Sequence, residues 1–255
     1  MSRGAPEEVL AETTHRPWPL PGGRWVMTQS WLDLVFLHWR IPAVALRSRI
    51  PAPLEIDEHD GSAWIGVVPF RMEGIRLRAL PPIPGTTAFL ELNVRTYVRH
   101  EGKPGVWFFS LDAGNAVMAA VARKWFGLPY HAAEMSMRGS GDGGFTFASR
   151  RVGAGGPAEF RAAWRPAGEA FQGKSGTLEH FLAERYCLYA PSPRGGLVRG
   201  EIHHGAWPLR PAEVDIAVNS MLAALELRVT GPPDAAHATP GVDALVWPPH
   251  RIGTP

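Results

Sequence analysis

A polar pair, Tyr130 and His131, follows the turn that ends an apolar, alanine-rich helix expected over Gly114–Phe126. Gly127 and Pro129 lie between the helix and the pair, and residues of these types end helices and fix the backbone that follows. Histidine titrates near neutral pH, and a tyrosine hydroxyl can donate to a developing oxyanion. The pair is therefore a candidate catalytic acid and base. The alternative is that Tyr130 packs on Pro129 while His131 binds a backbone carbonyl.

Three further polar residues, Glu91, Asn93 and Arg95, alternate with apolar ones along an expected strand. Residues two apart on a strand share a face, so these three side chains point the same way. They either line a cavity or form the solvent face of an ordinary sheet, and the sequence leaves both open. In a cavity, Arg95 would bind a substrate carboxylate through its two-pronged guanidinium, and Asn93 would contact the same ligand. Glu91 is a candidate catalytic residue.

The adjacent histidines His203 and His204 also lie on an expected strand, where neighbouring side chains point to opposite faces. They are poor partners for one metal ion, so we expect no metal site, and we take His203 as a candidate substrate-binding residue. Cys187 is the only cysteine, which excludes an internal disulfide and a cysteine-based zinc site. The glycine-rich segments are typical of hairpin loops, and we expect no cofactor.

Many short strands with few helices must position these residues. The expected strands are Trp31–Trp39, Ala63–Arg71, Phe89–Val98, Val106–Leu111, Ala133–Arg138, Gly144–Arg151, Ala158–Arg165, Arg185–Tyr189, Leu197–Trp207, Glu213–Ala217 and Leu245–Trp247. The expected helices are Pro42–Ile50, Gly114–Phe126 and Thr177–Ala183, with a helical turn near Asn219–Leu225. This pattern predicts a closed or sandwich-like sheet decorated by helices.

Composition narrows the class of protein. The formal net charge is +2 and the arginines are scattered, so the chain lacks the basic stripe that nucleic-acid binding requires. No apolar run approaches the roughly 18–20 residues needed to span a membrane. The first residues do not resemble a signal peptide, and we expect a cytoplasmic protein. We predict a disordered tail over residues 1–14 and a single domain over residues 15–250.

Segments in a fixed order along most of the chain carry a family resemblance. They are HRPWPLP (15–21), LHWRIP (37–42), DGSAWIGVVPF (60–70), FLELNVRTYV (89–98), FFSLDA (108–113), LPYHAAEM (128–135), ERYCLYA (184–190) and IHHGAWPL (202–209). Together they resemble a bacterial family of uncharacterised proteins, the domain of unknown function 2071. The resemblance implies a mainly β, α+β fold like that of acetoacetate decarboxylases: a twisted antiparallel β-barrel with a central cavity and a few packed helices.

The stretch from Arg123 to His131 is similar to the active-site turn of those decarboxylases, where an Arg-x-x-x-Gly-x-Pro frame precedes two lysines. The resemblance implies that Arg123 matches the arginine of that turn, as a substrate-binding residue, and that Glu91 matches a glutamate near the reactive lysine. Tyr130 and His131 occupy the two lysine positions here. Imine-forming decarboxylation is therefore not expected unless Lys124 reaches the cavity.

Three functions remain open at this point. The first is a barrel that binds a small organic molecule without Schiff-base chemistry. The second is a lyase, isomerase or hydrolase that uses Tyr130 and His131 for acid–base chemistry on a carbonyl or carboxylate compound. The third is a structural or interaction module without an enclosed pocket. Analogy with the decarboxylases also implies a homo-oligomer.

Overall fold

The computed structural model describes residues 4–81, 85–153, 156–227 and 229–253, and between 116 and 126 it describes the side chains of 116–120 and 123. The helices are α1 Pro6–Ala11, α2 Ala43–Arg47, α3 Ala116–Phe126, α4 Leu178–Ala183 and the short 3-10 helix η1 Ala223–Leu225. The strands are β1 Met27–Ile41, β2 Glu55–Ile56, β3 Ala63–Leu77, β4 Phe89–His100, β5 Lys103–Ala113, β6 Tyr130–Gly139, β7 Phe145–Arg151, β8 Glu159–Pro166, β9 Cys187–Pro191, β10 Leu197–His204, β11 Arg210–Asn219, β12 Ala235–Val246 and β13 His250–Ile252. The predicted mainly β fold is confirmed.

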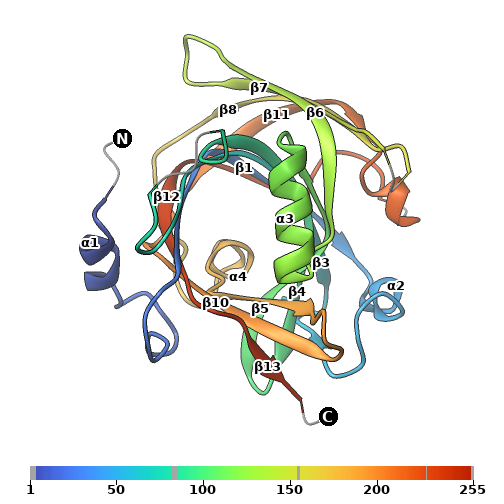
Figure 1. Ribbon diagram of the computed structural model, residues 1–255. Coiled ribbons are helices and arrows are strands. Elements are labelled where there is room, and N and C mark those ends of the chain that lie inside the picture. The colour runs from blue at the N-terminus through green and yellow to red at the C-terminus, as the bar shows by residue number, and fades with distance from the viewer. Residues whose placement is uncertain (1–3, 82–84, 154–155, 228, 254–255) are drawn as a thin grey trace.

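Strand pairing closes a ring. Antiparallel pairs run from β1 to β3, β4 and β5, the parallel pair β5–β9 follows, and antiparallel pairs lead through β10 and β12 back to β1. These strands curve round a common centre (Figure 1). Closure leaves the paired strands of the ring without open edges and separates an inner from an outer face.

A second antiparallel sheet of β6, β7, β8 and β11 covers part of the outer face of the ring (Figure 1). It joins the ring through the β5–β6 and β11–β12 pairs. Leu92 and Val94 on the outer face of β4 share a core with Phe147, Phe160 and Trp164 of this sheet. Strand β4 is therefore buried on both faces, and its polar residues face the inside of the ring.

Helices α3 and α4 pack against strands of the ring. Asn115 caps the start of helix α3, and its side-chain oxygen accepts hydrogen bonds from the backbone N–H groups of Val117 and Met118. Gly127 follows the last residue of the helix and adopts the left-handed conformation (φ 67°). A Cβ at Gly127 would lie 2.2 Å from the carbonyl oxygen of Pro191, so this turn requires glycine. Helix α4 lies within the outline of the ring (Figure 1). Its Leu182 belongs to the same apolar cluster as Trp64 of β3.

The described part of the predicted tail, residues 4–14, contains a helix. Helix α1 forms within residues 1–14, and its Val9 and Leu10 pack against Trp25, Leu245 and Trp247. Burial of these apolar side chains gives the short helix the tertiary support that its length alone does not provide.

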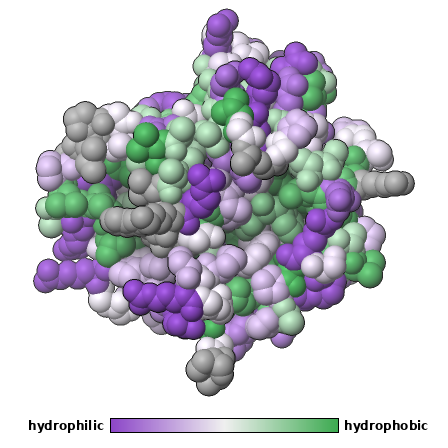
Figure 2. Space-filling model, turned by 45° about the vertical axis from the view of Figure 1, so that its right-hand side comes forward, coloured by the Kyte–Doolittle hydropathy of each residue, from purple (hydrophilic) through white to green (hydrophobic). Residues whose placement is uncertain are grey.

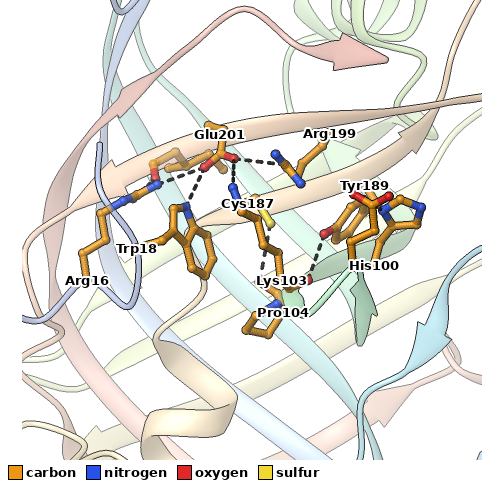
Figure 3. Close-up of polar contacts among 11 residues, drawn as sticks. Arg16, Trp18, His100, Lys103, Pro104, Cys187, Tyr189, Arg199 and Glu201 are labelled. Atoms are coloured by element: carbon orange, nitrogen blue, oxygen red, sulfur yellow. Dashed lines mark hydrogen bonds and ion pairs between the residues drawn. The ribbon is translucent and has the colours of Figure 1, made fainter. Parts of the chain in front are cut away.

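A buried carboxylate ties the segment after α1 to the ring. Glu201 of β10 accepts hydrogen bonds of 3.0 Å from Arg16 and Trp18, and its other oxygen lies 3.0 Å from Arg199 Nε and 3.8 Å from Lys103 Nζ (Figure 3). The side chains of Arg16 and Glu201 are 1% and 6% exposed. These contacts fasten the N-terminal segment to β10 and to the start of β5.

None of the described helices combines the length and the apolar character needed to cross a membrane. On the face drawn in Figure 2, hydrophobic residues form small groups separated by hydrophilic ones. Apolar side chains gather between the ring and the second sheet and also inside the ring, where the candidate site lies.

Candidate functional site

A pocket with a volume of about 170 Å³ lies inside the ring. Its walls are mostly apolar and include Leu34, Phe36, Val68, Phe70, Phe108 and Leu111. Helix α3 and the turn after it contribute Met118 and Leu128. The pocket therefore depends on the closure of the ring as well as on the helix–turn segment that the sequence singles out.

Polar groups enter this apolar pocket along one strand. Glu91, Asn93 and Arg95 of β4 all line it. The alternative of a solvent-facing sheet therefore does not hold, because the inner face of β4 borders the pocket and its outer face is covered by the second sheet. Strand alternation explains the shared face.

Glu91 and Tyr130 form a buried pair. The Tyr130 hydroxyl donates a hydrogen bond of 2.9 Å to Glu91 Oε2. Burial raises the pKa of Glu91 to about 8; the nearby charge of Asp112 adds to the rise, and the hydrogen bond from Tyr130 opposes it. Burial, followed by the charge of Glu91, raises the pKa of Tyr130 well above its ordinary value. At neutral pH both groups therefore hold their protons.

Arg95 is a cation without a carboxylate partner among the described residues. Its Nη2 donates to the carbonyl oxygen of Leu182 at 3.2 Å, and its guanidinium carbon lies 5.1 Å from the ring centre of Phe36. Nearby, His38 Nε2 contacts the Tyr97 hydroxyl at 2.6 Å. Burial, with the charge of Arg95 next, lowers the pKa of His38 well below its ordinary value. Arg95 is thus the charged group at this end of the pocket.

Two further polar side chains in the pocket wall lack hydrogen-bond partners within the part of the chain that the structure describes. The side chain of Asn93, 5% exposed, has no hydrogen-bond partner among the described residues. The indole N–H of Trp207 is likewise buried without one. Buried polar groups are normally hydrogen-bonded, so each exception needs an explanation such as a bound molecule.

The other candidate residues lie elsewhere. His131 follows Tyr130 on β6 and points to the opposite face, beside Asp112 in the register with β5. Arg123 is exposed on α3. His203 lies under the N-terminal segment, with Nε2 2.9 Å from the carbonyl oxygen of Val9. None of the three is among the described residues that line the pocket, and the roles expected for them stay predictions.

Sequence reasoning also missed lining residues. Trp207 lies in the segment IHHGAWPL but carried no signal by itself, because it follows β10 in a loop. Leu34 and Phe36 alternate within the apolar segment of β1, which could have indicated a shared inner face. For metals, the described residues contain no group of three or more His, Cys, Asp or Glu side chains placed to hold an ion.

The closed ring of strands and the apolar pocket inside it, where Arg95 has no carboxylate partner among the described residues, define a β-ring protein with an internal pocket. The chain belongs to the DUF2071 family, described as an uncharacterized conserved protein, whose model matches residues 28–243. It is 40% identical over 229 residues to the uncharacterized protein YqjF of Bacillus subtilis (strain 168), covering 90% of this chain and 93% of that relative.

Solved structures share the fold. The enduracididine biosynthesis enzyme MppR complexed with pyruvate matches with a TM-score of 0.62 at 14% identity, covering 93% of both chains. An acetoacetate decarboxylase-like enzyme from Sphingomonas wittichii RW1 matches with a TM-score of 0.62 at 14% identity, covering 95% of this chain and 99% of the other. An acetoacetate decarboxylase matches with a TM-score of 0.58 at 16% identity, covering 96% and 97%. The fold implied by the sequence resemblance is confirmed.

Proposed function

We propose that this protein binds a small, mainly apolar organic anion inside the ring, with the Arg95 guanidinium as the anchor for the anionic group. The observation that carries the proposal is the setting of Arg95, which lines an apolar pocket and pairs with no carboxylate among the described residues. Arg95 is half-buried, and a charge that is partly withdrawn from water is stabilised by an ionic partner. A bound carboxylate would supply the missing partner through two parallel hydrogen bonds.

The size and charge of the pocket support a ligand of this kind. Its volume is about 170 Å³, and cavities of roughly 150 Å³ hold molecules the size of benzene. Below its pKa of about 8, Glu91 is neutral and does not repel an anion. The enduracididine enzyme of the same fold was solved with pyruvate, which is a small carboxylate.

Binding without an imine is part of the proposal. An imine requires a lysine amine next to the ligand. The described residues that line the pocket include no lysine, and the side chain of Lys124, which the sequence left open, lies outside the described residues. The noncovalent proposal therefore relies on Arg95 and not on an amine.

The variant Arg95→Gln tests this function. Because a hydrogen bond to a charged group is worth roughly 1.5–3 kcal/mol, we expect the substitution to weaken binding of 4-methylpentanoate roughly 10- to 100-fold. Isothermal titration calorimetry measures the affinity, and circular dichroism checks that the variant is folded. The uncharged analogue 4-methylpentanamide should bind both proteins weakly.

Arg210→Gln is the matched control, because Arg210 is also half-buried and donates to a backbone carbonyl, that of Gly168, but does not line the pocket. It should bind the acid as the wild type does. Equal affinity of the wild type and Arg95→Gln for the acid would rule out Arg95 as the anchor.

A second candidate function is acid–base catalysis on a carbonyl compound, and the buried Glu91–Tyr130 pair favours it. A carboxyl group with a pKa of about 8 can both give and take a proton near neutral pH. This pair replaces Tyr130 and His131 as the candidate acid and base, because His131 points away from the pocket.

For this second candidate, we expect the wild type to accelerate deuterium exchange at the methylene next to the keto group of 2-oxo-4-methylpentanoate in D₂O. Loss of general acid–base catalysis costs roughly 100-fold or more in rate, so Tyr130→Phe and Glu91→Gln should exchange slowly and His131→Ala normally. Proton NMR follows the exchange. No acceleration by the wild type over buffer would remove this candidate.

A further inference from the structure

The amide of Asn93 is a buried polar group without a hydrogen-bond partner among the described residues. Its side chain is 5% exposed, lines the pocket beside apolar residues and has no hydrogen-bond partner among the described residues. A buried amide without a partner costs free energy. Retaining one in an apolar pocket is explained if the ligand supplies the missing hydrogen bonds.

Asn93 and Arg95 lie close enough to serve one small ligand. They are two residues apart on β4, which places their Cα atoms about 7 Å apart, and both side chains line the same pocket of about 170 Å³. When Arg95 holds the anionic group of a short ligand, the carbon atoms next to that group therefore lie near Asn93. A polar substituent for Asn93 must lie on those carbons.

We propose that the ligand is a short hydroxy acid, whose carboxylate pairs with Arg95 and whose hydroxyl group, on the second or third carbon, pairs with the amide of Asn93. This inference rests on the proposed binding function and names its ligand class. An asparagine amide offers two donors and one acceptor, and a hydroxyl offers one donor and two acceptor lone pairs, so a hydroxyl can pair with either end of the amide. A keto oxygen only accepts, and a methylene group does neither.

Acids with one carbon skeleton test the inference against the wild-type protein. They are 4-methylpentanoate, its 2-hydroxy and 3-hydroxy derivatives, and 2-oxo-4-methylpentanoate. A neutral hydrogen bond changes an equilibrium constant roughly 3- to 10-fold, so one of the hydroxy acids should bind about that much more tightly than both the plain acid and the keto acid. Isothermal titration calorimetry gives the four affinities.

Two variants assign the preference to Asn93. Asn93→Leu is expected to bind the hydroxy acid no more tightly than the plain acid. Asn219→Leu is the matched control, because the Oδ1 of Asn219 is also buried without a partner but lies on β11, outside the pocket lining. It should keep the wild-type preference. Circular dichroism checks that both variants are folded.

The two proposals fail differently. If the plain acid binds through Arg95 but neither hydroxy acid binds more tightly, or the keto acid binds best, the ligand class is wrong and the binding function stands. A preference for the hydroxy acid that persists in Asn93→Leu also overturns the role of Asn93. If none of the four acids binds, or Arg95→Gln binds them all as the wild type does, the binding function itself fails.

Discussion

At pH 9 the Glu91→Gln variant is expected to be more stable than the wild type by on the order of 4 kcal/mol, because burial raises the pKa of Glu91 from 4.5 to about 8. A carboxyl whose pKa is raised in the folded state contributes stability below its unfolded pKa and loses it as pH rises through the folded pKa. The loss therefore runs from pH 4.5 to about 8. Glutamine stays neutral and still accepts the hydrogen bond from Tyr130.

Urea unfolding at pH 5 and pH 9 measures the effect as the difference between the two proteins, which removes the titration of other groups. The difference should be much smaller at pH 5 than at pH 9. Glu134→Gln on β6 is the control, because Glu134 is exposed and forms a surface ion pair with Arg150. It should show no such pH-dependent gain. Parallel pH profiles for the wild type and Glu91→Gln would mean that Glu91 is ionised in the folded protein.

Glu201→Ala is expected to destabilise the protein by about 3–5 kcal/mol, the usual cost of removing one partner of a buried ion pair. The substitution leaves the guanidinium of Arg16, 1% exposed, without its carboxylate, and the indole N–H of Trp18 without its acceptor. The remaining hydrogen bond from Arg16 to the carbonyl oxygen of Ile202 does not neutralise the charge. The urea midpoint at pH 7 measures the loss.

Glu213→Ala provides the comparison for Glu201→Ala. Glu213 also pairs with an arginine, Arg165, but both side chains are about 60% exposed. Exposed ion pairs contribute roughly 0–1 kcal/mol, so this variant should unfold at nearly the wild-type midpoint. Losses of similar size in the two variants would show that burial of the Glu201 network adds nothing to its strength.

Local patterns predicted most of the elements. The alternating or apolar segments of β1, β3, β4 and β5 gave strands close to those observed. Helix α1 was missed, although Pro6 at its first position and Glu7 and Glu8 in its first turn are start signals. Most of β12 was also missed, because Pro240 and Gly241 are loop signals. The strand tolerates them since Gly241 adopts φ 122° against the carbonyl oxygen of Trp31, where a Cβ would lie 2.0 Å away.

The candidate site was predictable in part. A family resemblance placed Glu91 and Tyr130 in one site. The Tyr130 hydroxyl lies 2.9 Å from Glu91 Oε2, although the two residues are 39 positions apart in the chain. The prediction that Tyr130 and His131 act together assumed that both residues belong to the turn after α3. Strand β6 begins at Tyr130, so alternation starts there and separates the two side chains. The roles of all these residues stay predictions.

The sequence by itself determined which residues share a face, because strand alternation is a property of the local backbone. It also determined where α3 ends, at Gly127, and the family to which the chain belongs. Only the tertiary structure decided that the polar face of β4 lies inside, that Arg95 has no carboxylate partner there among the described residues, and that Trp207 joins the wall. These features depend on closure of the ring and on the sheet packed outside it, and both come from contacts between residues far apart in the chain.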